Sequence, residues 1–133
     1  MRILTVTVLA ALAAAGAAIG AQHMSAKTVK VKEKEWGMPA VPARVAAGKV
    51  TFVVRNVGRL KHEFVVVKTK RRAANLPLKG ARAVETGRVG KIPTFKPGQT
   101  KRLTLTLKRG HYVLFCNLPA HYKAGQRSDF SVK

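Results

Sequence analysis

The chain has 133 residues, which is enough for one ordinary domain and too few for two. It carries 26 Lys and Arg against 5 Asp and Glu, and this excess of positive charge attracts anionic partners of any kind without identifying one. The single cysteine excludes a disulfide within the chain.

Residues 1–20 are predicted to be a signal peptide. Arg2 is followed by an uncharged, alanine-rich run that is shorter than the ~20 apolar residues of a membrane-spanning helix. Ala18 and Gly20 fit the small residues of a secretory cleavage site, and a retained N-terminal anchor is the lesser alternative. We therefore expect a periplasmic or secreted protein with no stable membrane insertion after cleavage. A mature chain that starts Ala-Gln-His would also place His23 where an N-terminus can chelate Cu(II).

The first half of the mature chain predicts strands separated by a loop. Residues 27–36 alternate valines with charged residues, the period of a half-buried strand. Residues 37–48 contain two prolines and predict an extended or looped connection. Residues 49–56 and 61–70 are rich in β-branched and aromatic residues, which predicts two strands with a turn between them.

The second half begins with a less regular segment. Glycine and proline interrupt residues 70–99, for which we expect loops and one short helical turn around 81–85. Strands are predicted at 100–108, at 111–116 and again at the end of the chain, 127–133. Several short strands with few helices and frequent turns are typical of an all-β sandwich. No linker divides residues 21–133, so we expect a single domain.

Cys116 and His121 form a candidate metal-binding pair. Cys116 ends a predicted strand and His121 follows in the next loop, which the flanking strands hold at both ends. Thiolate and imidazole together select copper or zinc. Two imidazoles, one thiolate and a weak axial ligand make an electron-transfer copper site, whereas redox-inert zinc gives no reason for a weak fourth ligand.

A further histidine has to complete such a site. His62 lies where a glycine-containing loop meets an apolar strand, so it can reach the same end of a sandwich as Cys116. His111 starts the strand that Cys116 ends, which places it roughly 16 Å away at ~3.3 Å per residue. His23 lies in the N-terminal lead-in. His62 is therefore the predicted third ligand.

The segments HEFVV and GHYVLFCNLPAHYKAGQ resemble the small blue-copper proteins, the cupredoxins. The segments AGKVTFVVRNVG and KPGQTKRLTLTLKRG match the surrounding strands, so the resemblance covers residues 27–133. It implies a Greek-key β-sandwich or barrel of about seven or eight strands, with a loop-rich insertion around 70–99. It also implies one copper ion that cycles between Cu(I) and Cu(II).

Carried over to this chain, the resemblance makes His62, Cys116 and His121 the equatorial copper ligands. Gln126 stands where the family usually has methionine, as in the plant stellacyanins. An amide oxygen is harder than a thioether sulfur, so it favours Cu(II) and predicts a low reduction potential. If Gln126 does not bind, the copper is three-coordinate or takes a backbone oxygen.

The resemblance also predicts supporting roles around the ligands. The backbone N–H of Glu63 is expected to donate to the Cys116 sulfur. Asn56 is expected either to brace the loop before His62 or to act only in the turn. Ala120 stands where relatives often have glycine, and its methyl group is expected to shield or crowd His121. The aromatic residues expected in the core are Trp36, Phe52, Phe64, Phe115 and Phe130.

We expect a monomeric one-electron carrier and not an enzyme, with the edge of His121, ringed by Leu118, Pro119 and Ala120, as the electron exit. The basic surface predicts electrostatic steering toward an acidic redox protein, either a cytochrome or an oxidoreductase. Three alternatives stay open: a copper carrier or storage module, an open-site copper enzyme or sensor, and a cationic protein that binds nucleic acid or membrane. The last lacks interleaved aromatic and basic residues, so no specific nucleic-acid binding is expected.

Overall fold

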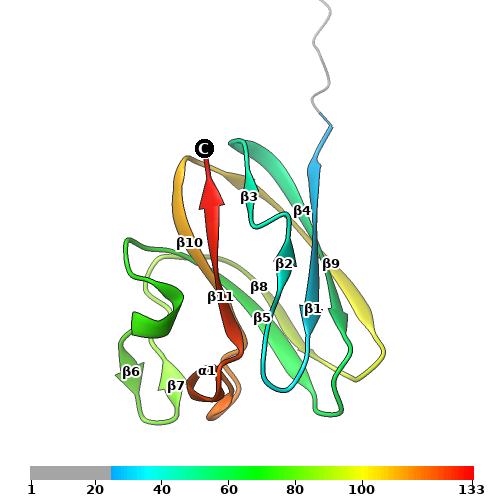
Figure 1. The fold of residues 1–133 in the computed structure, drawn as a ribbon, viewed down its shortest axis with the longest axis vertical. Coiled ribbons are helices and arrows are strands. Elements are labelled where there is room, and N and C mark those ends of the chain that lie inside the picture. The colour runs from blue at the N-terminus through cyan, green and yellow to red at the C-terminus, as the bar shows by residue number, and fades with distance from the viewer. Residues whose placement is uncertain (1–24) are drawn as a thin grey trace, which may run out of the picture.

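The computed structural model describes residues 25–133. The predicted signal peptide 1–20 and His23 lie outside the described residues. No helix within residues 25–133 is long and apolar enough to cross a membrane. The described chain folds into two large β-sheets packed face to face, with a separate two-stranded sheet, which confirms the predicted all-β sandwich (Figure 1).

One sheet has four strands in the order β2-β1-β4-β9. Their bounds are β1 Lys27–Glu33, β2 Ala40–Val41, β4 Gly48–Asn56 and β9 Thr100–Leu107. β1 runs parallel to β4, and β4 pairs antiparallel with β9. The alternation predicted from the sequence is confirmed, because Val29 and Val31 of β1 are buried while Lys30 between them is exposed.

The other sheet has five strands in the order β3-β11-β10-β5-β8. Their bounds are β3 Arg44–Val45, β5 His62–Lys68, β8 Arg88–Phe95, β10 Gly110–Phe115 and β11 Arg127–Val132. The loop 57–61 between β4 and β5 crosses from one sheet to the other, so these neighbouring strands do not form a hairpin. The described residues hold seven strands of six or more residues, as predicted.

The main hydrophobic core lies between the two sheets. The Phe52 ring packs 5.4 Å from Phe64 and 5.3 Å from Phe130, centroid to centroid. These rings and Phe115 are buried, as predicted. The prediction for Trp36 is wrong, because its side chain is 47% exposed. Trp36 follows the end of β1, in a turn where the alternation that buries side chains no longer applies.

The expected loop-rich segment 70–99 contains more structure than its sequence indicates. It holds a 3₁₀ turn η1 at Ala73–Asn75 and two short strands, β6 Leu78–Lys79 and β7 Arg82–Ala83, before the long strand β8. The helical turn predicted around 81–85 is therefore wrong. β8 is the edge strand of its sheet, and an edge tolerates a proline such as Pro93.

A second apolar cluster lies on the outer face of the five-stranded sheet. Val65 and Val67 of β5 point to this face, and the segment that contains η1, β6 and β7 covers them. The remaining members are Ala73, Leu76, Ala83, Val113, Phe115 and Tyr122. β5 is consequently buried on both faces, which explains its continuous apolar sequence.

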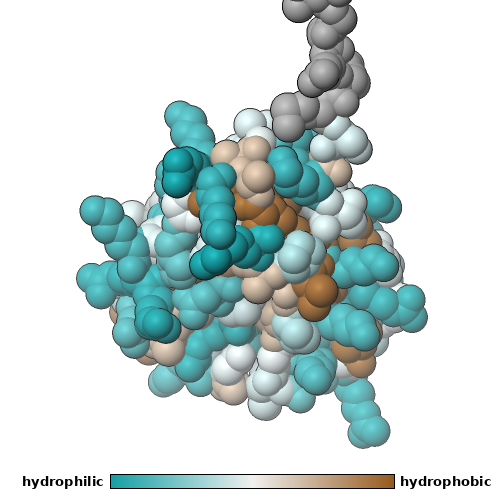
Figure 2. All heavy atoms as spheres, turned by 45° about the horizontal axis from the view of Figure 1, so that its top comes forward, coloured by the Kyte–Doolittle hydropathy of each residue, from teal (hydrophilic) through white to brown (hydrophobic). Residues whose placement is uncertain are grey.

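The surface carries almost no free negative charge. Four of the five acidic side chains lie within 3.2 Å of a lysine, arginine or histidine nitrogen, and the fifth, Glu33, is fully buried. Hydrophilic side chains project around much of the face that Figure 2 brings forward. The lysines and arginines of the described residues therefore dominate the outward electrostatic field.

Candidate metal centre

The strand pairing brings His62 and Cys116 to one end of the sandwich. His62 is the first residue of β5, and Cys116 follows β10 directly. β5 and β10 are antiparallel neighbours with Val65 opposite Phe115, so the start of one lies beside the end of the other. His121 begins the single helical turn α1, His121–Ala124, in the loop that follows Cys116.

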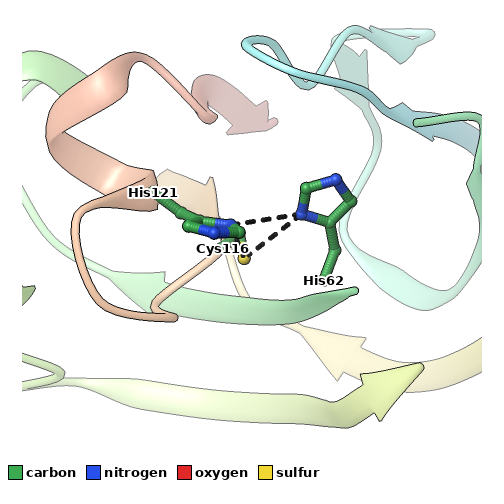
Figure 3. A group of neighbouring side chains, drawn as sticks. All are labelled: His62, Cys116 and His121. Carbon is green, nitrogen blue, oxygen red and sulfur yellow. Dashed lines mark hydrogen bonds between the residues drawn. The ribbon is translucent and has the colours of Figure 1, made fainter. Parts of the chain in front are cut away.

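Three of the four predicted ligands form one cluster. The Nδ1 atoms of His62 and His121 lie 3.2 Å apart. The Cys116 Sγ atom is 3.8 Å from Nδ1 of His62 and 3.4 Å from Nδ1 of His121. In Figure 3 one nitrogen of the His62 ring faces the His121 ring and the Cys116 sulfur. Three soft or borderline donors aimed at one point are the arrangement that a metal ion requires.

The loop from Cys116 to Gln126 is closed by backbone hydrogen bonds. The Cys116 N–H donates to the carbonyl of Gln126 at 3.1 Å, and the Gln126 N–H donates to the carbonyl of His121 at 3.2 Å. Ala120, before α1, adopts a left-handed conformation with φ 68°. Such closure fixes the spacing between the thiol and the second imidazole before any metal binds.

The Cys116 thiol is fully buried and accepts one predicted hydrogen bond. The backbone N–H of Glu63 donates to Sγ at 3.4 Å, which confirms the prediction. Burial raises the pKa of the thiol to about 12, although backbone N–H groups, Glu63 among them, act in the opposite direction. A metal ion has to displace this proton, so metal affinity rises with pH.

Both imidazoles are held in the neutral form that binds metals. Burial lowers the pKa of His62, and a hydrogen bond with the Glu35 carboxylate opposes that shift. Burial also lowers the pKa of His121. His62 is fully buried and His121 is partly exposed. The contact between Glu35 and His62 was not predicted, because nothing in the sequence links a glutamate in a lysine-rich stretch to a histidine 27 positions later.

Gln126 is fully buried beside the cluster, and neither its amide oxygen nor its amide nitrogen has a hydrogen-bond partner in the described residues. A buried polar group without a partner destabilises a fold by about 1–3 kcal/mol, so the site suits an additional partner for this amide. The Gln126 amide also acts on the neighbouring His121, where it partly opposes the lowering of the His121 pKa by burial. Axial ligation by Gln126 stays a prediction that these features favour.

Two asparagines brace the loops on either side of the cluster. The Asn56 amide donates to the carbonyl of Leu60 at 2.8 Å and accepts from the Gly58 N–H at 3.0 Å, so Asn56 braces the loop before His62, which is one of the two roles expected for it. Asn117, which sequence reasoning missed, accepts from the Ala83 N–H at 2.8 Å and donates to the Ala83 carbonyl at 2.9 Å. The outer strand β7 thereby holds the residue next to the cysteine.

His111 lies at the opposite end of β10, as predicted. Its Nδ1 contacts the carbonyl oxygen of Thr69 and its Nε2 contacts a carboxylate oxygen of Asp129, both at 2.8 Å. Neither nitrogen is therefore free to bind a metal. Among the described histidines, only His62 and His121 present a nitrogen to the cysteine.

Comparisons with solved structures agree on the fold. The auracyanin of Roseiflexus castenholzii is 22% identical with a TM-score of 0.61, covering 82% of this chain and 98% of that one. The "blue" copper protein auracyanin A of Chloroflexus aurantiacus is 21% identical with a TM-score of 0.61, covering 82% and 100%. Rusticyanin of Thiobacillus ferrooxidans is 19% identical with a TM-score of 0.57, covering 82% and 79%.

Among curated proteins, the copper-resistant cuproprotein CopI of Vibrio cholerae is 32% identical over 77 residues. The match covers 57% of this chain and 46% of CopI, so the chain spans less than half of that relative. No family model matches the chain. The donor set of two imidazoles and one thiolate fits copper, and the solved structures that share the fold include a blue copper protein. The resemblance seen in the sequence is therefore confirmed: the chain has the cupredoxin fold, with a His-Cys-His cluster that fits a type 1 copper site.

Proposed function

We propose that the chain is an exported copper protein that carries one electron at a time between redox partners. The observation that carries this proposal is the convergence of His62, Cys116 and His121 on one point inside a rigid sandwich. The sequence of residues 1–20 supports export. Copper, when bound, supplies a Cu(I)/Cu(II) couple at this point.

The protein's contribution is to hold the three donors still. His62 is fixed at the start of a strand that is buried on both faces, and Cys116 at the end of its neighbour. His121 is fixed by the closed loop that ends at Gln126. A scaffold that does not move between oxidation states keeps the reorganisation energy small, which favours fast electron exchange.

Gln126 makes a low reduction potential part of the proposal. Its amide oxygen is buried next to the cluster and has no other partner in the described residues. A hard oxygen donor stabilises Cu(II) more than Cu(I), and a methionine sulfur would do the reverse. The same burial argues against catalysis, because Gln126 would occupy the position that an open-site enzyme leaves for its substrate.

The electron exit is proposed at the exposed side of His121. The Trp36 ring packs edge-on against this imidazole, with 4.9 Å between centroids. Trp36 and Leu60 are both about half exposed, at 47% and 46%, and come from loops at the metal end. Pro119 adds a further exposed apolar residue. Exposed apolar side chains around a metal ligand suit a transient docking surface.

Cations around this end favour an acidic partner. Arg59 and Lys61 are exposed in the loop before His62, and Lys123 is exposed in α1. Charges of one sign around a docking surface accelerate encounters with a partner of the opposite sign. Association should slow as salt is added, since the screening length is ~10 Å at 0.1 M ionic strength. We propose that the protein acts as a monomer.

A second candidate function is copper handling in metal resistance. The match to the copper-resistant cuproprotein CopI favours it, although that match spans less than half of CopI. A protein that only sequesters copper needs tight binding but not rapid redox cycling. Tight binding combined with slow exchange between Cu(I) and Cu(II) would therefore select this function over electron transfer.

Copper loading of the purified protein tests the proposal. One equivalent of Cu(II) should give an intense visible thiolate-to-copper band and a type 1 paramagnetic resonance spectrum, and voltammetry should show a reversible one-electron wave. Cys116→Ala should remove the band. A wild-type protein that binds copper without a thiolate band would overturn the proposed site. A normal band without a reversible wave would leave the resistance function.

A further inference from the structure

Glu35 lies in a tight turn that leads away from β1. The turn is closed by two backbone hydrogen bonds between Lys34 and Gly37, of 2.7 and 3.2 Å. A carboxylate oxygen of Glu35 lies 2.8 Å from Nε2 of His62, on the side of the ring away from Cys116. Glu35 is therefore in direct contact with a predicted copper ligand without belonging to the cluster.

The position of the Glu35 carboxylate is fixed by the loop before His62. The Leu60 N–H donates to one of its oxygens at 2.9 Å, and the Arg59 N–H lies 3.2 and 3.0 Å from the two oxygens. These backbone donors stabilise the ionised form of the carboxyl group, which is its usual form in neutral solution.

Gly58 leaves the space that this carboxylate occupies. A Cβ atom added at Gly58 would lie 2.4 Å from both carboxylate oxygens of Glu35. Any residue with a side chain at position 58 would therefore overlap the Glu35 carboxylate in its present position. The loop 57–61 is shaped around Glu35, which distinguishes this contact from a chance surface pairing.

The contact determines which nitrogen of His62 carries the proton. A carboxylate only accepts hydrogen bonds, so Nε2 of the ring donates. In a neutral imidazole the other nitrogen then has a free lone pair, and this nitrogen is the Nδ1 that faces Cys116 and His121. A histidine that binds a metal through one nitrogen is commonly oriented by a carboxylate on the other.

We propose that Glu35 is a positioning residue for the metal centre: its carboxylate fixes the Nε2–H tautomer of His62 and stabilises the more highly charged Cu(II) through that ring. The inference rests on the proposed copper site. It adds a negative charge 2.8 Å from the far side of a ligand, which acts in the same direction as an axial oxygen of Gln126. Both features lower the reduction potential.

Three variants separate positioning from simple loop capping. Glu35→Ala removes both the acceptor and the charge. Glu35→Gln keeps an oxygen acceptor for Nε2–H but removes the charge. Asp129→Asn is the matched control, because it makes the same change of charge in the other histidine–carboxylate pair, at the far end of the sandwich.

The first measurement is nitrogen NMR of the histidine rings in the copper-free protein. The Nε2–H form of His62 should dominate in the wild type, in Glu35→Gln and in Asp129→Asn, and Glu35→Ala should show a mixture of tautomers. Changes in Glu35→Ala that are confined to the Arg59 and Leu60 amides would identify Glu35 as a loop cap only and overturn the inference. Because no copper is present, this result does not depend on the proposed function.

The second measurement compares Cu(II) and Cu(I) affinities by competition with chelators. Both Glu35 variants should lose about 10–100-fold in Cu(II) affinity and less in Cu(I) affinity. Each tenfold difference between the two losses raises the potential by about 59 mV. An unchanged affinity ratio in both variants would overturn the inference, with Glu35→Gln deciding if Glu35→Ala does not fold. A wild-type protein without a copper–thiolate band would refute the proposed function instead.

Discussion

Each end of the sandwich holds a histidine against a carboxylate, yet among residues 25–133 only one end gathers a cluster of metal-binding side chains. His62 contacts Glu35, and His111 contacts Asp129, both at 2.8 Å. The difference lies in the second ring nitrogen. In His62 it faces the Cys116 sulfur, and in His111 it is occupied by a backbone carbonyl. Both histidines contact a carboxylate through Nε2, so this contact alone does not make a histidine a metal ligand. What distinguishes His62 is that its Nδ1 faces another metal-binding group.

The two pairs also differ in burial. The His62 side chain is fully buried, whereas that of His111 is 30% exposed among lysines and arginines. Water therefore screens the second pair more than the first, in which only the Glu35 side chain is partly exposed, at 21%. The same chemical contact should therefore have a large effect on metal binding at one end and a small effect on stability at the other.

The largest predicted difference between the two ends is in copper affinity. His62→Ala should lower Cu(II) affinity by more than about 100-fold and abolish the thiolate band, since losing a direct ligand exceeds the loss of a supporting contact. His111→Ala should leave both unchanged. Competition with a chelator of known affinity, together with absorption spectra, measures both effects. Copper loss in His111→Ala would mean that the far end contributes to the site.

The next largest expected effect is on stability, and it comes from the buried carboxyl group of Glu33. It is fully buried, and neither of its oxygens has a hydrogen-bond partner in residues 25–133. Burial raises its pKa from 4.5 to about 9, and the charge of Glu63 adds to the shift. Between those two pH values the folded protein holds a proton on Glu33 that the unfolded chain releases, so the contribution of Glu33 to the free energy of unfolding should fall as pH rises from 5 to 9.

Urea unfolding of the copper-free protein at pH 5, 7 and 9 measures this slope. Each pKa unit corresponds to about 1.4 kcal/mol, so the upper limit for Glu33 is about 6 kcal/mol. Glu33→Gln keeps the shape of the side chain and cannot ionise, so the wild type should lose stability relative to this variant as pH rises from 5 to 9. Parallel profiles would show that the Glu33 carboxyl has a partner or water that keeps its pKa low.

Much of this arrangement follows from strand periodicity. The alternation of valines and leucines defines β1, β4 and β9, and the apolar run of β5 defines a strand buried on both faces. Counting residues along β10 is enough to place His111 and Cys116 at opposite ends. The three clustered donors could therefore be predicted, because His62 and Cys116 lie at the boundaries of strands that the sequence indicates and His121 follows Cys116 in the next loop.

The supporting residues could not be predicted, because their partners are far apart in sequence. Glu35 meets His62 across 27 positions, and Asn117 meets Ala83 across 34. The edge strand β8 was missed because glycine and proline interrupt it, while its pairing with β5 overrides that local signal. Trp36 was assigned to the core by residue type alone, although its contact with His121 depends on the turn after β1.

A smaller effect is expected on the reduction potential of the copper when the buried amide of Gln126 is replaced. Its two polar atoms have no partner in the described residues, whereas His111 and Asp129 at the far end satisfy each other. Gln126→Met replaces a hard donor with a soft one, so the potential should rise by roughly 60 mV for each tenfold gain in relative Cu(I) affinity. Voltammetry that shows no shift would mean that Gln126 does not bind the copper.

The smallest predicted effect concerns the backbone at the two ends. Ala120 in the metal loop has φ 68°, whereas the turn at the far end uses a glycine, Gly110, with φ 147°. An L-residue in the left-handed region is strained by ~1–2 kcal/mol, partly offset in glycine by its greater loss of entropy on folding. Ala120→Gly should therefore stabilise the protein by about 0.5–1 kcal/mol.

Gly110→Ala is the matched opposite, and it should destabilise the protein. The new Cβ would lie 2.7 Å from a methylene carbon of Lys68, which can move away, but the strain at φ 147° would remain. Urea unfolding of the copper-free variants measures both changes, and the copper spectrum checks that Ala120→Gly leaves His121 in place. If Ala120→Gly is not more stable than the wild type, the closed loop between Cys116 and Gln126 holds the left-handed alanine without strain. Backbone strain would then not distinguish the metal end of the sandwich from the far end.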